Sequence, residues 1–405
     1  MKQIVGWVLF LMILMVFVAC GMNNEEGVTY EPETVVAVEP SPEPTPTPTL
    51  EPTPTPNPEL ESAEPEVPFV FLAAGAASSF GIDENGNLWA WGGQTGLTDA
   101  TLSPILFMEN VSQVISGTYP SHAFAIDNNG GLWGFGANNA GKIGDGTIQN
   151  RYEPVFIMDN IVAAAPGSFH SIALDANGVV WAWGSNERGQ LGNGTNSLSL
   201  EPVRVLEDIV AVAAGAQHSA ALDVDGTVWT WGANHRGQLG NGTVRNSNLP
   251  VAVKDNVRAI SIGSENTYAI TNDDVLWSWG LNNGGQLGDG TTENQHLPVR
   301  IMDDVAYVYG GLGYALLITV DGGLWTFGAN HRGHLGIGTI EPEWNRGTYP
   351  QRILEGITMA VGGGGHGLAL DNEGNLWSWG RNENGQTGDG LTTDRPYPQR
   401  VIFLD

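Results

Sequence analysis

The strongest constraint on the fold of this chain is a four-residue signature that occurs seven times. The signature consists of an aromatic residue, a small residue, a second aromatic residue and glycine, and it contains 12 of the 14 tryptophans. Its first tryptophans are separated by 44, 48, 48, 48, 48 and 52 residues. Such regular copies are typical of arrays in which each unit buries its apolar faces against its neighbours. The copies are Trp89 to Gly92, Trp133 to Gly136, Trp181 to Gly184, Trp229 to Gly232, Trp277 to Gly280, Trp325 to Gly328 and Trp377 to Gly380.

One copy reads as short strands joined by tight turns. In the third copy, Val162 to Ala165 and Ser171 to Leu174 are apolar runs of strand length, and Val179 to Trp183 is another. Asp175 to Gly178 separates the last two runs and supplies turn residues, which predicts a hairpin. Pro202 to Val205 then begins a further strand. About 48 residues per copy and four strands per unit predict an all-β, seven-bladed β-propeller over residues 67–405.

The two aromatic residues of the signature lie on one face of their strand, because side chains alternate along a strand. In the third copy these are Trp181 and Trp183. We therefore expect each copy to present a pair of large rings for packing against the next blade.

These residues also carry a family resemblance. The fourth copy resembles the repeat of the regulator of chromosome condensation family, which folds as a seven-bladed propeller, and the resemblance extends from Phe69 to Asp405. The first copy departs from it, because Gly93-Gln94-Thr95-Gly96 replaces the long glycine loop. The matching residues are Gly215, His218-Ser219, Ala221-Leu222, Asp225-Gly226, Val228-Trp229, Trp231-Gly232, Asn234 and Gly237 to Gly240.

The resemblance implies several activities. The founding member of the family is a nuclear nucleotide-exchange factor for a small GTPase and binds chromatin. Other members are secreted bacterial propellers, one of which inhibits β-lactamases with a face of its ring. A shared fold does not transfer a target, so none of these activities is carried over to this chain.

The two ends of the repeat region look complementary. Val67 to Leu72 corresponds to Ile209 to Val212 inside a repeat, and Pro398 to Leu404 corresponds to Pro202 to Leu206. We therefore expect the C-terminal strand to join the N-terminal blade, so that pairing of the N- and C-terminal strands closes the ring. The chain has one cysteine, so no intramolecular disulfide can close it.

The first 20 residues read as a signal peptide. Lys2 precedes an apolar run from Ile4 to Ala19, which is shorter than the roughly 20 residues of a spanning helix. Phe17-Val18-Ala19-Cys20 resembles the lipobox of bacterial lipoproteins, so Cys20 is the expected lipidation site. An ordinary cleaved signal peptide and an uncleaved anchor are the alternatives. Each of them places the propeller outside the cytoplasm, and lipidation would anchor it at the cell surface.

Residues 21–66 form a Pro/Thr/Glu-rich segment, for which we expect a disordered linker. Alternating prolines favour extended polyproline II, and the glutamates repel one another. At about 3.1 Å per residue, the segment would extend up to roughly 140 Å. A proline-rich docking motif is the alternative.

The charge of the chain disfavours nucleic acid as a partner. The net charge is −28, and Asp and Glu outnumber Lys and Arg by 44 to 16. Such a surface repels phosphate backbones.

No catalytic, cofactor-binding or metal site is expected. His122, His170, His218 and His366 occupy one repeat position, for which we expect hydrogen bonds to backbone at a blade corner. A position spread around a ring seldom brings metal ligands together. The Asp-x-Asn-Gly segments fit hairpin turns better than calcium loops. The sequence shows no nucleophile elbow and no zinc-protease motif, so we expect no enzyme.

The expected function is that of a non-enzymatic, surface-tethered binding module, a monomer that touches the membrane only through its N-terminal anchor. Its loop face would contact a protein or a cell-envelope component; a secreted enzyme inhibitor and a glycan-binding lectin are the alternatives. A loop insertion in the sixth copy carries Trp344 and Arg346, whose composition is typical of binding hot spots. Trp344 could instead cover a blade edge. The other candidate partner-binding residues are Arg188, His235, Arg236, His331 and Arg332.

The anchor can be tested at Cys20. Cys20→Ser should leave an unprocessed or mislocalised precursor, because the lipidated sulfur would be missing. Mass spectrometry of the native protein should show a lipid adduct on Cys20. Normal processing of the variant together with an unmodified native cysteine would contradict lipidation.

Overall fold

The structure is a computed structural model that describes residues 69–93, 101–117, 122–338 and 347–401. All regular structure in these ranges is β-strand. None of it is a helix of the length and apolarity needed to cross a membrane. The predictions for the signal peptide, for Cys20 and for the linker fall outside the described residues, as do those for Trp344 and Arg346.

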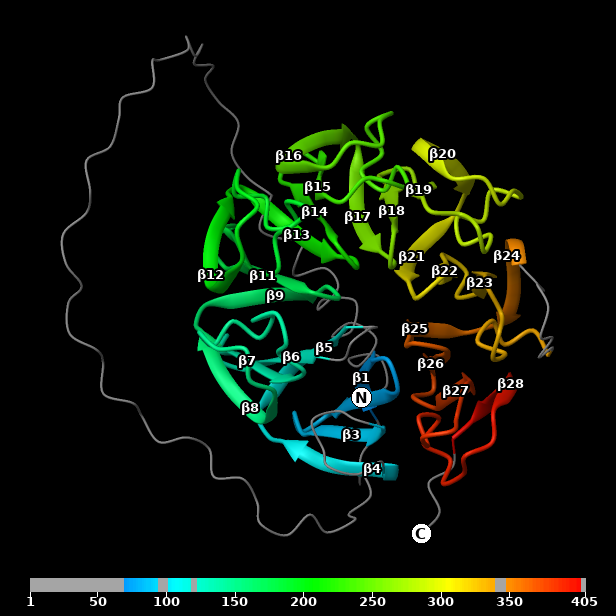
Figure 1. Cartoon of the computed structure of the whole chain (residues 1–405). Coiled ribbons are helices and arrows are strands. Elements are labelled where there is room, and N and C mark those ends of the chain that lie inside the picture. Colours follow the sequence, from blue (N-terminus) through cyan, green and yellow to red (C-terminus); the bar gives the residue numbers. More distant parts are fainter. Residues whose placement is uncertain (1–68, 94–100, 118–121, 339–346, 402–405) are drawn as a thin grey trace, which may run out of the picture.

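Seven four-stranded antiparallel sheets surround a common centre (Figure 1), which confirms the seven-bladed β-propeller. Blade 1 contains β1 (Phe69–Ala74), β2 (Ser78–Asp83), β3 (Leu88–Gly92) and β4 (Thr101–Met108); blade 2 contains β5 (Val111–Ser116), β6 (His122–Asp127), β7 (Leu132–Gly136) and β8 (Arg151–Met158); blade 3 contains β9 (Ile161–Pro166), β10 (His170–Asp175), β11 (Val180–Gly184) and β12 (Ser199–Leu206). Blade 4 contains β13 (Ile209–Ala214), β14 (His218–Asp223), β15 (Val228–Gly232) and β16 (Ser247–Lys254); blade 5 contains β17 (Val257–Ile262), β18 (Asn266–Thr271), β19 (Leu276–Gly280) and β20 (Gln295–Met302). Blade 6 contains β21 (Val305–Gly310), β22 (Tyr314–Thr319), β23 (Leu324–Gly328) and β24 (Gly347–Leu354); blade 7 contains β25 (Ile357–Gly362), β26 (His366–Asp371), β27 (Leu376–Gly380) and β28 (Arg395–Arg400).

In five of the seven blades an aspartate at the end of the second strand organises the hairpin turn, and Thr271 and Thr319 take its place in blades 5 and 6. In blade 3, Asp175 Oδ1 accepts hydrogen bonds from the backbone N–H groups of Asn177 and Val179, at 2.9 and 3.0 Å. Its Oδ2 accepts from Trp181 Nε1 at 3.1 Å, so one carboxylate holds both the turn and the first signature tryptophan. This confirms the turn interpretation of the Asp-x-Asn-Gly segments. The same carboxylate–indole bond joins Asp83 to Trp89, Asp127 to Trp133, Asp223 to Trp229 and Asp371 to Trp377.

The second aromatic residue of the signature packs against the preceding blade, so the expectation of packing against the next blade was wrong. Trp183 is fully buried against Phe124 and Leu132 of blade 2, and its Nε1 donates to Lys142 O at 2.8 Å. Alternation shows which residues share a strand face. It does not show which neighbour that face meets, because this depends on the order of blades around the ring.

The outer edge of every blade is blunted by proline. Proline has no N–H to donate to an added strand, so it discourages edge-to-edge pairing with another chain. In Figure 1 the fourth strand of each blade lies at the periphery. These strands carry Pro104, Pro154, Pro202, Pro250, Pro298, Pro350 and Pro398 at equivalent positions.

Strand pairing between the chain ends does not close the ring, which corrects our expectation. β28 pairs with β27 in blade 7, and β1 pairs with β2 in blade 1. Each copy begins at its innermost strand and ends at its outermost strand, so the blades coincide with complete copies. Closure comes from a core in which Phe69 and Trp91 of blade 1 meet Leu368 and Val401 of blade 7.

The strand order gives the disc two different faces. The loops between first and second strands and between third and fourth strands lie on one side, the loop face. The hairpin turns and the connectors between blades lie on the other side, the turn face. Phe69 is paired with Asp83 of a turn, and Val401 N donates to Leu376 O beside another turn, at 2.8 Å. Both described ends of the propeller therefore lie at the turn face.

The closing interface should be as stable as an internal one. Leu368 at the interface of blades 7 and 1 and Ile172 at the interface of blades 3 and 4 are equivalent and fully buried. Leu368→Ala and Ile172→Ala should each lower the free energy of unfolding by about 2 to 5 kcal/mol, because each leaves a cavity. Urea denaturation measures both. A much smaller loss in Leu368→Ala would contradict a closed ring.

Candidate functional site

In blades 2 to 7, buried amides hold the described parts of the loops between third and fourth strands. In blade 3, Asn186 Oδ1 accepts from Leu191 N at 3.0 Å, and its Nδ2 donates to Thr195 O at 3.0 Å. Gln190 Oε1 accepts from Arg188 N at 2.9 Å, which holds the backbone of the loop tip. Both amide side chains are buried. The loop is therefore a rigid mount for the exposed side chains at its tip.

Each of these loops lies over the next blade. Gln190 O accepts hydrogen bonds from Ser219 Oγ and Trp231 Nε1 of blade 4, both at 2.9 Å. Gly192 has a φ of +76°, and a Cβ there would lie 2.7 Å from Trp231 Nε1. A side chain at this position would collide with the indole, which explains the second glycine of Gly-Gln-Leu-Gly.

The recurring histidines join neighbouring blades. His170 Nε2 lies 2.8 Å from Ser219 Oγ, whose hydroxyl hydrogen goes to Gln190 O. The histidine nitrogen must therefore be the donor. The expected bond to backbone is formed indirectly, through a hydroxyl of the next blade. The same bridge occurs as His122–Ser171, His218–Thr267 and, at the closing interface, His366–Ser79.

Where the histidine is absent, its partners change with it. Ser78 replaces the histidine in blade 1. In blade 2, the positions equivalent to Ser219 and Trp231 are Ala123 and Phe135, which have no hydroxyl and no indole N–H. Asn266 replaces the histidine in blade 5, and the two equivalent positions of blade 6 are Ala315 and Phe327. At the last variant position, Tyr314 Oη donates instead to the backbone oxygens of Gly363 and His366, at 3.0 and 2.8 Å. The residue at the histidine position of one blade thus changes together with its partner residues in the next blade. This covariation between copies is present in the sequence and would have predicted the contact.

Burial keeps these histidines neutral. It lowers the pKa of His170, His218 and His366 to about 3 each. Among the described residues there is no group of three or more His, Cys, Asp and Glu side chains that could hold a metal ion. The hydrogen bonds of these histidines assign them a role in joining blades.

The structure brings the described candidate residues to one face. Arg188, His235, Arg236, His331 and Arg332 are all exposed at equivalent loop tips of blades 3, 4 and 6. His235 Nε2 lies 2.8 Å from Glu265 Oε1 of blade 5, and Arg332 Nη1 lies 3.7 Å from Glu383 Oε2 of blade 7.

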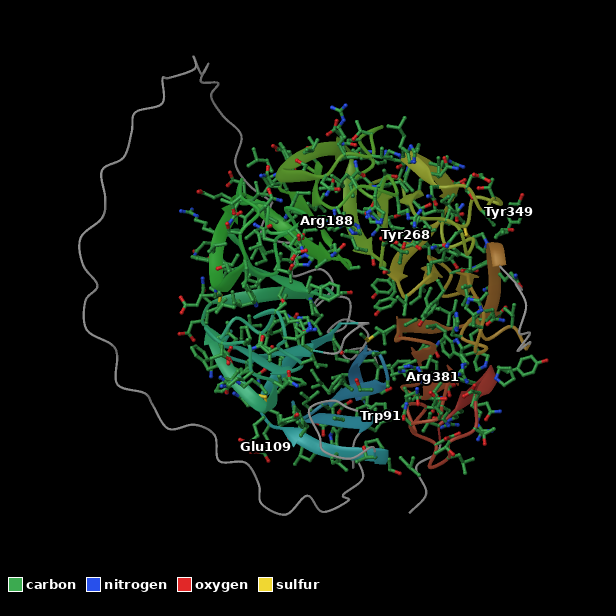
Figure 2. The ribbon with its side chains drawn as sticks, in the orientation of Figure 1. Trp91, Glu109, Arg188, Tyr268, Tyr349 and Arg381 are labelled. Atoms are coloured by element: carbon green, nitrogen blue, oxygen red, sulfur yellow. The ribbon has the colours of Figure 1, made fainter. Side chains whose placement is uncertain are left out.

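Sequence reasoning missed two arginines on this face. Arg381 follows β27 and forms an ion pair with Glu383, and Arg245 lies in the returning half of the loop of blade 4. Arg188 and Arg381 are labelled in Figure 2. A comparison of charges at equivalent positions along the whole loop would have found both.

The turn face is strongly acidic. Its described hairpin turns and connectors contain no lysine or arginine, and the arginines that reach it from the strands, Arg204, Arg258, Arg300 and Arg352, are ion-paired with its carboxylates. The loop face carries both signs of charge. The acidic residues on the turn face are Asp83, Glu84, Glu109, Asp127, Asp159, Asp175, Glu207, Asp208, Asp223, Asp225, Asp255, Asp273, Asp274, Asp303, Asp304, Asp321, Glu355, Asp371 and Glu373.

Comparisons with known proteins agree with the ring. The model of the RCC1-like domain family matches residues 93–405. Yeast RCC1 (Prp20), solved with Kap60, is 22% identical with a TM-score of 0.70, over 84% of this chain and 86% of that one. Prp20p from Saccharomyces cerevisiae, whose report describes its binding to Gsp1p and histones, is 22% identical with a TM-score of 0.65, over 78% and 86%. Human WBSCR16 is 21% identical with a TM-score of 0.61, over 84% and 83%. No curated protein matches the chain. At these identities, the solved structures show the fold alone.

The buried histidines predict acid sensitivity. Because the folded pKa of His218 is about 3 and the usual value is 6.5, the unfolded chain takes up a proton first as pH falls. Its contribution to stability is complete above pH 6.5 and is lost between there and about pH 3. Lowering the pH from 7 to 5 should reduce the free energy of unfolding of both proteins. The reduction should be about 2 kcal/mol smaller in His218→Gln than in the wild type.

Urea titrations at the two pH values measure this difference. His331→Gln changes an exposed loop-tip histidine and serves as the control variant. An identical loss in the wild type and in His218→Gln would contradict a neutral, buried His218.

Proposed function

Because the chain belongs to the RCC1-like domain family, the regulator of chromosome condensation family that its repeats resemble, we propose that it is a non-enzymatic binding module. We further propose that Cys20 tethers it at the cell surface and that its loop face receives a protein or a cell-envelope component. The observation that carries this proposal is the opposition of the two faces, one holding Phe69 and Val401, the described ends of the propeller, and the other holding the loop tips.

The position of the ends supports this orientation. Phe69 and Val401 lie at the turn face, so a tether leaving Phe69 begins on the side away from the loop tips. A linker anchored at Cys20 would then direct the loop face away from the membrane.

The loop tips have the properties of a preformed binding surface. Arg188 and Arg236 are exposed, while the Gln190 and Gln238 side chains hold their backbones at 2.9 and 2.8 Å. A backbone that is already ordered loses little entropy on binding. We extend the proposal to Trp344 and Arg346 on their sequence position alone, between Gly338 and Gly347 in blade 6.

The use of the titratable groups supports a non-enzymatic role. The recurring histidines are neutral and engaged between blades, and the turn aspartates hold turns and tryptophans. A general base needs a proton-accepting group within reach of a substrate. Side chains engaged in these contacts serve the ring instead.

The mixed charges of the loop tips favour a protein partner over a uniform sugar array. The similar yeast proteins are described with protein partners, namely Kap60, Gsp1p and histones, and those partners are theirs alone. The acidic surface of this chain argues against nucleic acid. A secreted enzyme inhibitor is the second candidate, because a rigid, exposed face also suits inhibition.

Site-specific photo-crosslinking in the intact cell envelope tests the proposal. A photoreactive residue would replace Asn139, Asn283 or His331 on the loop face, and Asp159, Asp225 or Glu373 on the turn face as matched controls. All six side chains are exposed. Adducts should form from the loop-face positions, because a partner covers that face. Adducts from the turn face alone would contradict the orientation, and none from either face would contradict a binding module.

A further inference from the structure

Most described arginines of this acidic chain are paired with carboxylates, and three neighbouring ones are not. The paired ones are Arg151, Arg204, Arg258, Arg300, Arg332, Arg352, Arg381 and Arg395. Arg188, Arg236 and Arg245 are exposed and form no ion pair within the described part of the chain. Arg400, near the turn face, is the other described arginine of this kind. Acidic residues are abundant in this chain, so the absence of an ion pair at these described arginines is informative.

An equivalent arginine shows what pairing looks like at this loop position. Arg332 of blade 6 has the same place as Arg188 and Arg236, and its Nη1 lies 3.7 Å from Glu383 and 3.6 Å from Asp394 of blade 7. The carboxylates of the following blade thus compensate its charge.

The partner positions next to Arg188 and Arg236 carry no carboxylate. The equivalents of Glu383 and Asp394 in blade 4 are His235 and Asn246, and in blade 5 they are Asn283 and Asn294. The two asparagines keep the structural role of Asp394, because each side-chain oxygen accepts a backbone N–H bond at 2.9 Å, as Asp394 does. Only the negative charge is missing. Both guanidinium groups are therefore left for a partner outside the ring.

The three arginines lie on loops that touch each other. A Cβ at Gly189, next to Arg188, would lie 2.5 Å from Asn248 Cα of blade 4. Asn234 Nδ2 donates to Arg245 O at 3.0 Å, two residues before Arg236. The flanking apolar side chains Leu198, Val244 and Leu249 are 53%, 50% and 57% exposed. We call these three arginines and three apolar residues the arginine surface.

We propose that the arginine surface binds a carboxylate-rich segment of a partner protein. Guanidinium groups bind carboxylates bidentately, and such bonds are among the strongest polar contacts. The exposed apolar side chains favour a polypeptide over a phosphate polymer, because a polypeptide also supplies apolar groups. The inference rests on the proposed function and specifies the chemistry of its partner.

A peptide titration with the full chain tests this inference. The probe is a fluorescein-labelled peptide, Glu-Glu-Leu-Glu-Glu-Leu-Glu-Glu, whose binding is followed by fluorescence anisotropy. The triple variant Arg188→Gln/Arg236→Gln/Arg245→Gln should bind at least about tenfold more weakly. The charge-matched control Arg204→Gln/Arg300→Gln/Arg352→Gln, whose three arginines are ion-paired in the wild type near the turn face, should stay within about twofold. Raising salt from about 50 to about 200 mM should weaken wild-type binding.

Charge reversal gives a second arm that does not depend on the triple variant alone. A variant with glutamate in place of the same three arginines should lose affinity for the glutamate peptide. It should gain affinity for a peptide in which each glutamate is replaced by lysine. Equal losses in the triple variant and in the charge-matched control would overturn the inference. So would stronger binding of inorganic polyphosphate than of the peptide.

Two further outcomes separate an external acidic partner from the chain's own linker and from a partner bound elsewhere on the ring. Peptide binding that appears only after the glutamates of residues 21–66 are replaced by glutamine would assign the arginine surface to the linker, and would overturn an external partner. In the envelope crosslinking experiment, a partner that the triple variant retains unchanged would overturn the inference and leave the proposed function standing. Absence of any crosslink in the wild type would contradict the proposed function itself.

Discussion

Four of the seven blade interfaces, the closing one among them, depend on one junction, in which a loop carbonyl accepts two hydrogen bonds from the following blade. Gln190 O receives the hydroxyl of Ser219 and the indole N–H of Trp231, and the same hydroxyl accepts from His170. All of these groups are buried, so an unpaired member would carry a desolvation cost of about 1 to 3 kcal/mol. The junction therefore joins the blades and holds the loop in place.

This junction also separates scaffold from surface within a single loop. The buried half of the loop consists of amides and glycines that the packing requires, such as Asn186 and Gly192. The tip is exposed and can change its charge without disturbing the ring. Arg188 and Arg332 occupy equivalent tips with different surroundings, because the partner positions beside Arg188 carry no carboxylate and those beside Arg332 carry two. Differences of this kind can create a specific surface on a repetitive scaffold.

Closure of the ring uses the same chemistry. Ser79 Oγ donates to Gln386 O at 2.7 Å and lies 3.0 Å from His366 Nε2, so blade 7 meets blade 1 as blade 3 meets blade 4. A ring whose seven copies are each complete has no need to exchange a strand between its ends. Both ends consequently leave the ring at the acidic turn face, which gives the molecule its polarity.

The sequence by itself determined the number of blades, their strands and the hairpin turns, because the period, the alternation of side chains and the chemistry of Asp175 to Gly178 are local properties. It also placed Arg188 and Arg236 at loop tips. Only the tertiary structure decided which neighbour Trp183 packs against, how the ring closes and which arginines have carboxylate partners. The packing of Trp183, the closure of the ring and the pairing of Arg332 depend on contacts between residues of different blades, about 40 or more positions apart. Local patterns carry no information on the direction in which one blade meets the next.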